Sequence, residues 1–417
     1  MKQSNAGANR TANLQQVKAA NKGLLFSLIH HNGPLSRADL TNRTKLSPTT
    51  VSTLVSELIG QGLVGELGPA ETPGSGRKPI LLALIPRGAL FLSVELAREC
   101  FEVAIFDLHG TELGQSREGI EDYGEIGVRL IRVAERLMAG LKVDEGRLRG
   151  ICIGAPALMD PERESIIAST VLTIAQRNDF IPILRRRFED AVVQLENESI
   201  LSAYAEMEFG VVIGIRDLLY IDIDTGIGAG IVLDGHPYRG SSGMAGEIGH
   251  VSIDIDGPPC PCGNRGCVEQ LANVPALIRM VIQMLESGRY SPCLKDLGDN
   301  ACQIDFGSLC RAAEQQDPLV LEAIDEISRR LASGINSALN ILNPQAVVIG
   351  GRMAALGDIL FDRLEHHLAG IALQPWAGTR RIRRSSIKGN AVTIGGARLL
   401  LDQFLALPAL GRWPGTE

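Results

Sequence analysis

The sequence predicts an α/β protein in three parts: a small α+β head over residues 12–84, followed by two α/β lobes over residues 88–212 and 213–417. Three observations lead to this prediction. Residues 12–84 have the periodicity of three short helices followed by a hairpin. From residue 90 onward strands alternate with helices, and the order of these elements recurs after residue 218. In the second lobe, residues 246–269 gather three cysteines in one short loop.

Length and composition limit the class of protein. A chain of 417 residues is too long for one ordinary core, and a 45% share of hydrophobic residues with 46 glycines is typical of a soluble α/β protein with many turns. No apolar run reaches the ~18 residues of a membrane span, and residues 1–19 lack the apolar centre of a signal peptide. We therefore expect a cytoplasmic protein whose eight cysteines stay reduced.

Charge is distributed unevenly along the chain. Residues 1–80 hold nine Lys and Arg against four acidic residues, a net charge of +5. Because the whole chain carries −7, the remaining residues carry −12. A basic head on an acidic body indicates that the head alone meets an anionic partner, for which nucleic acid is the obvious choice.

The head reads as a winged helix-turn-helix. A first helix is expected to end at Gly33-Pro34, with an inward face made of Val17, Asn21, Leu24, Leu25 and Leu28. Ser36 and Asp39 form a capping box for a second helix. Ser47-Pro48 begins the third helix, because serine is a good N-cap and proline loses no hydrogen bond at the first helical position.

The third helix has the features of a recognition helix. Its inward face is predicted to consist of Val51, Leu54, Val55 and Leu58. Short hydroxyl side chains at Thr49, Thr50, Ser52 and Thr53 are left outside, where they can reach phosphates and base edges in a major groove. A plain three-helix packing unit is the alternative interpretation.

A hairpin follows the third helix. Two short apolar strands flank a tip rich in glycine and proline that bears Arg77 and Lys78, which is typical of a wing whose arginine enters a narrow minor groove. The predicted DNA contacts of the head are Arg37, Ser47, Thr49, Thr50, Ser52, Thr53, Arg77 and Lys78.

The two lobes are predicted from alternating strands and helices. In the first lobe we expect strands at 90–96, 100–108, 112–117, 150–154 and 192–196, and helices at 126–141, 183–188 and 199–209. In the second we expect strands at 218–222, 228–233 and 346–349, helices at 276–285, 307–314 and 319–342, and a last strand and helix within 385–397, after the arginine-rich run 380–384. This order is that of the actin-like, hexokinase-like ATPase fold.

The cysteine loop predicts a structural zinc site. Cys260, Cys262 and Cys267 lie within eight residues that also hold two glycines, and His250 can add a fourth ligand from a preceding strand. Four N and S ligands are what structural zinc selects, and they leave no open position for a catalytic water. Three ordinary thiols in a turn are the alternative.

The spacing in this loop resembles the zinc signature of the ROK family, which groups bacterial sugar-responsive repressors with sugar kinases. The family motif is Gly-Glu-x-Gly-His, nine residues, then Cys-x-Cys-Gly-x-x-Gly-Cys-x-Glu, and every fixed position is matched between Gly246 and Glu269. The resemblance implies that Glu247, His250 and Glu269 contact sugar hydroxyls, with His250 also ligating zinc. Residues 36–40, 46–52 and 76–79 are similar to the DNA-binding domain of ROK repressors, which the kinases lack.

A sugar kinase with an accessory DNA-binding domain is the main alternative. ROK kinases carry Asp-x-Gly-Gly-Thr on their first strand, whereas residues 95–99 here read Glu-Leu-Ala-Arg-Glu, whose side chains fill the space that phosphate needs. The family's catalytic Asp lies in Glu-Asn-Asp, and the matching residues are Glu196-Asn197-Glu198. The resemblance therefore favours a protein without catalytic residues, in which Asn197 and Glu198 still bind sugar hydroxyls.

From the sequence we expect a transcriptional regulator of the ROK type, most simply a repressor, that binds double-stranded operator DNA as a homodimer and responds to a sugar or sugar derivative. A regulator controlled by a protein partner in place of a small molecule is a further alternative. The sequence names neither the sugar nor the operator.

Overall fold

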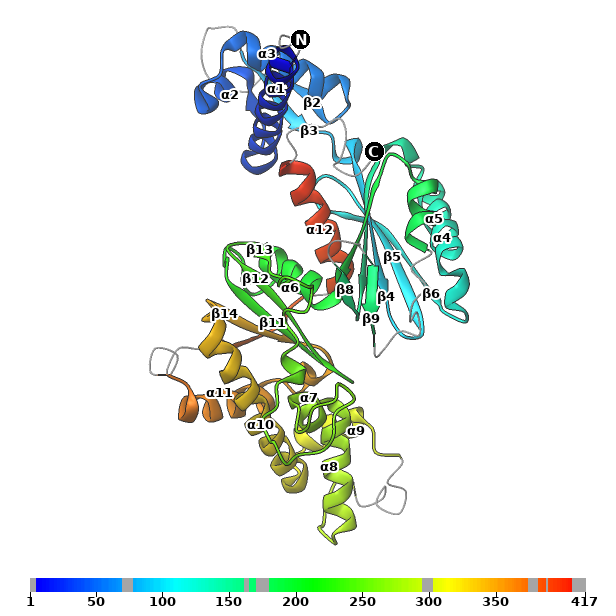
Figure 1. Ribbon diagram of the computed structural model, residues 1–417, viewed down its shortest axis with the longest axis vertical. Coiled ribbons are helices and arrows are strands. Elements are labelled where there is room, and N and C mark those ends of the chain that lie inside the picture. Colours follow the sequence, from blue (N-terminus) through cyan, green and yellow to red (C-terminus); the bar gives the residue numbers. More distant parts are fainter. Residues whose placement is uncertain are drawn as a thin grey trace. The chain divides into compact units, whose positions relative to one another are not determined.

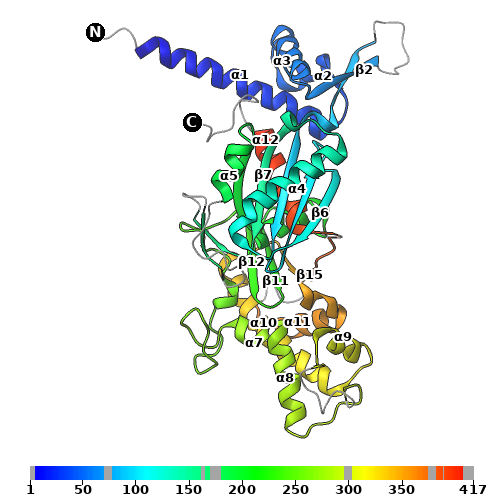
Figure 2. The ribbon, with the colours of Figure 1, turned by 90° about the vertical axis from the view of Figure 1, so that its right-hand side faces the viewer.

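A computed structural model describes residues 5–69, 78–160, 165–169, 180–294, 303–373, 382–387 and 389–406, with side chains from residue 16 onward. These residues group into two compact units (Figures 1 and 2). Unit 1 comprises Met1–Ala157, Glu164–Glu196 and Val392–Glu417, and unit 2 comprises Leu158–Arg163 and Asn197–Ala391. This grouping differs from the predicted lobe boundaries, because 197–212 join unit 2 and the C-terminal helix joins unit 1. No helix in the described ranges is long and apolar enough to cross a membrane.

The head lies in unit 1 and has the elements that the sequence predicts. Its helices are α1 (Asn5–Asn32), α2 (Arg37–Thr44) and α3 (Pro48–Gly60), and its strands are β1 (Leu35–Ser36), β2 (Val64–Pro69) and β3 (Ile80–Leu84). The strands form an antiparallel sheet in the order β1-β3-β2. Ser36 and Asp39 cap α2 reciprocally, as predicted, and the Ser47 side chain accepts a hydrogen bond from the Thr50 backbone N–H at the start of α3.

The inward face of α1 differs from the prediction. Val17 and Leu24 are 52% and 45% exposed, whereas Leu25, Phe26 and Ile29 are buried. Leu25 was predicted to face inward and does so, but Phe26 and Ile29 are buried in place of Val17 and Leu24. Helix α1 packs on α2, α3 and β3 of the head, and Phe26 also meets a distant partner.

That partner is the C-terminal helix α12 (Ala391–Ala406). The ring of Phe404 on α12 packs edge-on against Phe26, with 5.8 Å between ring centroids. The same ring packs against Phe91 of the first lobe at 5.6 Å. Three buried aromatic rings thus join the head, the C-terminal helix and the first sheet within unit 1.

The rest of unit 1 is a five-stranded sheet covered by helices. Its strands are β4 (Leu90–Leu96), β5 (Cys100–Phe106), β6 (Glu112–Gly119), β7 (Leu148–Ala155) and β10 (Val192–Asn197), in the order β10-β7-β4-β5-β6. Helices α4 (Ile126–Leu141) and α5 (Phe180–Arg187) cover one face and α12 covers the other (Figures 1 and 2). Short elements complete this part: η1 (Pro86–Gly88), η2 (Tyr123–Glu125), η3 (Glu145–Arg147) and β9 (Ser165–Ala168). Strand β8 (Leu158–Asp160) belongs to unit 2.

Unit 2 repeats the same sheet plan. Its strands are β11 (Leu218–Ile223), β12 (Ile227–Leu233), β13 (His236–Pro237), β14 (Ala346–Gly350) and β15 (Ile382–Arg384), in the order β13-β12-β11-β14-β15. In both units the first strand pairs antiparallel with the next and parallel with a later one, β4 with β5 and β7, β11 with β12 and β14. The predicted duplication is therefore present in the strand order.

Helices of unit 2 bury the core of this sheet. They are α6 (Glu198–Phe209), α7 (Val268–Ala272), α8 (Val274–Glu286), α9 (Phe306–Glu314), α10 (Pro318–Leu342) and α11 (Asp358–Ile371), with 3-10 turns η4 (Ile248–His250) and η6 (Arg352–Leu356). The predicted last strand lies earlier than expected, inside the arginine-rich run, because Ile382 pairs with Val347 of β14 and buries its side chain while Arg383 and Arg384 stay exposed.

Candidate functional site

The cysteine loop is an irregular segment of unit 2 held by backbone turns. Cys260 N–H donates to the Asn264 carbonyl at 2.8 Å, and Gly263 N–H donates to the Cys260 carbonyl at 3.0 Å. Gly266 has φ +59°, and a Cβ there would collide with the Asp254 carbonyl oxygen. Glycine is required at this position because the backbone is both left-handed and closely approached.

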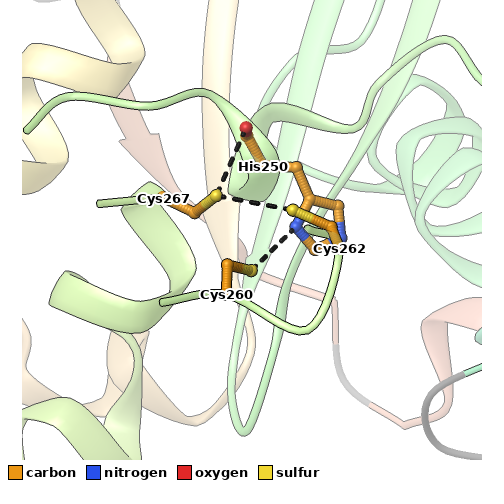
Figure 3. Close-up of side chains that lie close together, drawn as sticks. All are labelled: His250, Cys260, Cys262 and Cys267. Atoms are coloured by element: carbon orange, nitrogen blue, oxygen red, sulfur yellow. Dashed lines mark hydrogen bonds between the residues drawn. The ribbon is translucent and has the colours of Figure 1, made fainter. Parts of the chain in front are cut away.

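The four predicted metal ligands meet at one point (Figure 3). Their ligand atoms all lie within 4.8 Å of one another. The Cys260 Sγ lies 3.7 Å from His250 Nδ1, and the Sγ atoms of Cys262 and Cys267 are 3.7 Å apart. Zn–S bonds of about 2.3 Å in a tetrahedron place sulfur atoms about 3.8 Å apart. The observed spacing fits such an ion, although His250 comes from the 3-10 turn η4 and not from a strand as predicted.

Without a cation, the Cys267 thiol favours its protonated form. Burial, together with hydrogen bonds and charge from Cys260 and Cys262, raises the pKa of Cys267 to about 12. Three adjacent thiolates without a cation repel one another, whereas a metal ion stabilises all of them in the deprotonated form. These residues can therefore hold a metal ion.

Two of the predicted effector ligands border this cluster. Glu247 Oε2 lies 3.7 Å from His250 Nε2, the ring nitrogen that faces away from Cys260. Burial raises the pKa of Glu247, an effect that His250 opposes and the charge of Glu269 reinforces. Glu269, on α7, accepts a hydrogen bond from the Ile227 backbone N–H at 2.9 Å. Glu247, His250 and Glu269 thus lie along one side of the cysteine loop.

The other predicted effector residues begin α6 in the same unit. Asn197 is the N-cap of α6 and accepts a hydrogen bond from the Ser199 N–H at 2.8 Å. Helix α6 packs closely on β12, because a Cβ at Gly230 would collide with the Ser199 carbonyl. The segment that leads into η4 also packs on β12, since a Cβ at Gly246 would collide with the Ala229 carbonyl. Strand β12 therefore lies against both groups of predicted effector ligands.

The predicted DNA contacts have different surroundings. Thr49, Ser52, Thr53 and Lys78 are exposed, whereas Ser47 and Thr50 hydrogen-bond each other through their hydroxyl oxygens at 2.8 Å. Arg37 forms an ion pair with Glu66 of β2 at 2.9 Å, so its charge is partly satisfied inside the head. Arg77 lies outside the described residues.

A salt bridge at the turn between β11 and β12 was not predicted from the sequence. Arg352 Nε donates to Asp224 at 2.6 Å, and the Asn273 amide donates to the Thr225 carbonyl at 2.6 Å. Together with the hydrogen bond from Ile227 N–H to Glu269, three side chains thus bond to the turn between β11 and β12. Asn273 could have been noticed as an N-cap before Pro275, whereas no sequence signal pairs Arg352 with Asp224.

Three comparisons place the chain among known proteins. The profile of the ROK family matches residues 91–403. The xylose repressor of Bacillus subtilis (strain 168) is 29% identical over 391 residues, which cover 93% of this chain and 97% of the repressor. A crystal structure of a ROK family transcriptional regulator, a homologue of the E. coli Mlc protein, matches with a TM-score of 0.81 and 28% identity over 94% of this chain and 97% of that one. A ROK hexokinase from Thermus thermophilus matches with a TM-score of 0.60 and 26% identity over 74% of this chain and 96% of its own.

Proposed function

Because this chain belongs to the ROK family, we propose that it is a transcriptional repressor released from its operator by a sugar or sugar derivative. The observation that carries the proposal is the share of this chain that each class of relative matches. A relative named as a repressor matches 93% of the chain, whereas a hexokinase matched over 96% of its own length covers only 74% of it. The head lies outside the residues 91–403 that the family profile matches, and it is the part that a regulator needs in addition to the shared body.

The proposed DNA-binding domain is residues 12–84. Its recognition helix is α3, whose exposed Thr49, Ser52 and Thr53 are available for the major groove. Thr50 already bonds Ser47, so these two hydroxyls can contact DNA only while keeping or exchanging that bond. The ion pair with Glu66 lowers the expected contribution of Arg37.

We propose that the protein acts as a homodimer in the cytoplasm, where operator DNA lies. One recognition helix reads only a few base pairs, and two half-sites related by the two-fold axis of a dimer supply the specificity that a genome requires. The body would then carry two lobes per subunit for effector binding and for subunit contact.

In the proposed effector site, zinc has a structural role and the carboxylates bind the ligand. His250, Cys260, Cys262 and Cys267 would hold the ion, and zinc would stabilise the irregular loop without taking part in any reaction. The carboxylates of Glu247 and Glu269 would accept hydrogen bonds from sugar hydroxyls, while Asn197 and Glu198 would contribute from α6. Carboxylate acceptors beside a preorganised loop suit a polyhydroxylated ligand.

We propose that the protein does not phosphorylate the sugar. Where the family's kinases carry two glycines, this chain has Ala97 and Arg98, in the turn between β4 and β5. The methyl group of Ala97 and the side chain of Arg98 fill the space that the bare backbone of a phosphate cradle requires. A coupled ATP assay over a panel of sugars should show no turnover above background, and clear phosphorylation of any sugar would favour the kinase alternative.

The decisive experiment begins with an unbiased DNA selection. The purified full chain is incubated with a random duplex pool, and we expect it to enrich an inverted-repeat site. A thermal-shift panel of sugars, amino sugars and sugar phosphates then identifies a ligand that raises the midpoint, because a ligand bound only by the folded state stabilises it. Titration of the selected site with and without that ligand tests release. Failure to enrich any DNA sequence would contradict the proposed function.

Thr50→Ala tests the assignment of the recognition helix. We expect about tenfold weaker operator binding, corresponding to about 1.4 kcal/mol, with an unchanged thermal shift by the sugar. Ser56→Ala on the same helix is the matched control, because Ser56 is exposed but lies further from the N-terminal turn. Equal effects of both substitutions would argue against this assignment.

A further inference from the structure

The C-terminal end of α3 is enclosed by residues from outside the head. Helix α3 ends at Gly60, and Gly62 then adopts a left-handed conformation with φ +71°. Gly62 N–H donates to the Ile59 carbonyl at 2.9 Å, and Leu63 N–H donates to the Leu58 carbonyl at 3.1 Å. This pattern is a Schellman motif, in which glycine is favoured because its backbone accepts a positive φ.

Arg147 of the first lobe binds this helix end directly. Its Nη1 donates to the Gln61 carbonyl at 2.7 Å, across 86 residues of sequence. The guanidinium lies against Gly62, since a Cβ at Gly62 would be 2.6 Å from Nη1 and 2.8 Å from Nη2. Glycine is thus needed twice here, for its conformation and for the space that Arg147 occupies. A cation at a helix C-terminus also stabilises the partial negative charge of the helix dipole.

Residues 85–88, the segment that connects the head to the first lobe, pack against the other side of Gly62. A Cβ at Gly88 of η1 would collide with the Gly62 carbonyl oxygen. Ile85 N–H donates to the Leu63 carbonyl at 2.9 Å, and Leu108 N–H of the first lobe donates to the Pro86 carbonyl at 3.0 Å. The end of α3 is therefore held between the connecting segment and Arg147.

We propose that Arg147 is a positioning residue that fixes the orientation of the recognition helix on the first lobe and thereby sets the spacing of the two half-sites that a dimer reads. This inference rests on the proposed function. The aromatic contact of Phe26 with Phe404 also joins the head to the lobe, but apolar packing has little directional preference. A hydrogen bond from a planar guanidinium to one carbonyl is directional and resists rotation of α3.

The Arg147 side chain also has an ion-pair partner in its own turn. Asp144 Oδ2 lies 3.8 Å from Arg147 Nε, and both side chains come from the turn that contains η3. The arginine is therefore oriented from within the first lobe, and any movement of that turn would be passed to the end of α3. No residue of the head has to unfold for this to happen.

The test compares an isolated half-site with complete operators. Using the inverted repeat selected by the wild-type chain, we would prepare a single half-site duplex and operators in which the half-site spacing is changed by one or two base pairs. Four full-length proteins are titrated: the wild type, Arg147→Ala, Arg147→Lys and the control Arg149→Ala. Arg149 lies two residues further on but its Nη1 donates only to the nearby Gly146 and Leu148 carbonyls, at 2.8 and 3.2 Å.

We expect the wild type and Arg149→Ala to prefer one spacing strongly. Arg147→Ala should bind the isolated half-site as tightly as the wild type, but should lose about fivefold or more in affinity for the preferred operator and tolerate altered spacings better. Arg147→Lys, which keeps the charge but not the planar donor, should fall between the two.

Three outcomes would overturn the inference. Arg147→Ala could bind both the half-site and the operator as the wild type does, or it could lose affinity for both equally, which would assign the residue to folding of the head. A wild-type protein that binds every spacing alike would also contradict it. Failure of the wild type to select any DNA would instead refute the proposed function, and this inference with it.

Discussion

The two units share one sheet plan but differ at the same turn. Between β4 and β5 of unit 1 the chain carries charged side chains, and Glu95 faces Glu102 across the strands. In unit 2 the corresponding turn between β11 and β12 holds Gly226, and Gly228 and Gly230 follow on β12. The backbone at this turn therefore carries charged side chains in unit 1 and glycines in unit 2.

The contacts around the retained glycines explain the difference. A Cβ at Gly226 would lie 3.0 Å from Glu269 Oε2, and one at Gly228 would lie 2.9 Å from the Ser199 hydroxyl oxygen. The glycines of unit 2 are thus needed so that α6 and the carboxylate beside the cysteine loop can approach β12. A glycine in an ATPase-like sheet is therefore no sign of phosphate binding by itself, because close packing of a helix on the sheet requires it as well.

The largest effect is expected from removal of the metal, which should impair unit 2 but not DNA binding by unit 1. Cys260→Ser with Cys262→Ser should reduce bound zinc from about one ion per chain to almost none and abolish the thermal shift by the sugar, because the loop loses two of its four ligands. DNA binding by the head should persist but no longer respond to the sugar. Metal analysis and operator titration measure both.

The matched control for this double variant is Cys293→Ser with Cys310→Ser, which changes two thiols of unit 2 outside the cluster. It should retain zinc and the sugar response. Wild-type protein purified without any bound metal would contradict the metal assignment.

Glu247→Ala is expected to separate ligand binding from metal binding. The variant should keep its zinc, since Glu247 contacts only the outer ring nitrogen of His250. Sugar affinity should fall by about 1.5–3 kcal/mol, the range for a hydrogen bond to a charged group. Calorimetric titration with the sugar from the thermal screen measures the change, with Glu286→Ala on the exposed end of α8 as control. Unchanged affinity would remove Glu247 from the site.

A pair of glycine substitutions tests the packing explanation itself. Gly230→Ala should destabilise the protein by about 1–3 kcal/mol, because the new methyl group would collide with the Ser199 carbonyl and overpack the α6 contact. Gly119→Ala, on β6 of unit 1, should change stability by less than about 0.5 kcal/mol, since its Cβ would lie 3.7 Å from the Glu99 carbonyl oxygen. Denaturant unfolding measures both. Equal effects would contradict the packing explanation.

The smallest effect is expected in unit 1, whose stability should depend on pH through His30. Burial, followed by the charges of His31, Arg398 and His109, lowers the pKa of His30 from 6.5 to about 4. As the pH falls from 6.5 towards 4, the unfolded chain takes up a proton that the folded protein does not, so stability decreases.

His30→Gln should therefore lose less stability than the wild type between pH 7 and pH 5. Calorimetric midpoints at both values provide the measurement, and His366→Gln on the exposed surface of α11 is the control. If the wild type and His30→Gln have parallel pH profiles, His30 does not carry this dependence.

Local sequence signals predicted the regular elements well. The expected ranges 90–96 and 126–141 coincide with β4 and α4, because a mainly apolar run and a 3.6-residue period depend on nearby residues alone. The clustering of His250, Cys260, Cys262 and Cys267 was also predicted, since they lie within 18 residues of one another and their spacing is itself the signal. Helix α11 was not predicted, although Leu360, Leu364 and Leu368 have helical spacing and are buried.

Features set by distant partners were not predictable. Phe26 of α1 is buried against Phe404, which follows it by most of the length of the chain. Strand β15 has three residues, two of them exposed arginines, and is defined only by its pairing with β14. The ion pair of Arg37 with Glu66 likewise joins two elements that sequence periodicity cannot align.

The place of α12 in the chain has a consequence for biosynthesis. This helix belongs to unit 1, where Leu400 lies against Gly150 and Phe404 against Phe26 and Phe91, yet all of Asn197–Ala391 is translated before it. At about 5–20 residues per second, the ribosome needs on the order of 10–40 s to add that segment. During this interval the apolar surfaces of Phe26 and Phe91 lack their native cover. We therefore expect nascent unit 1 to expose apolar aromatic surface until translation reaches Phe404.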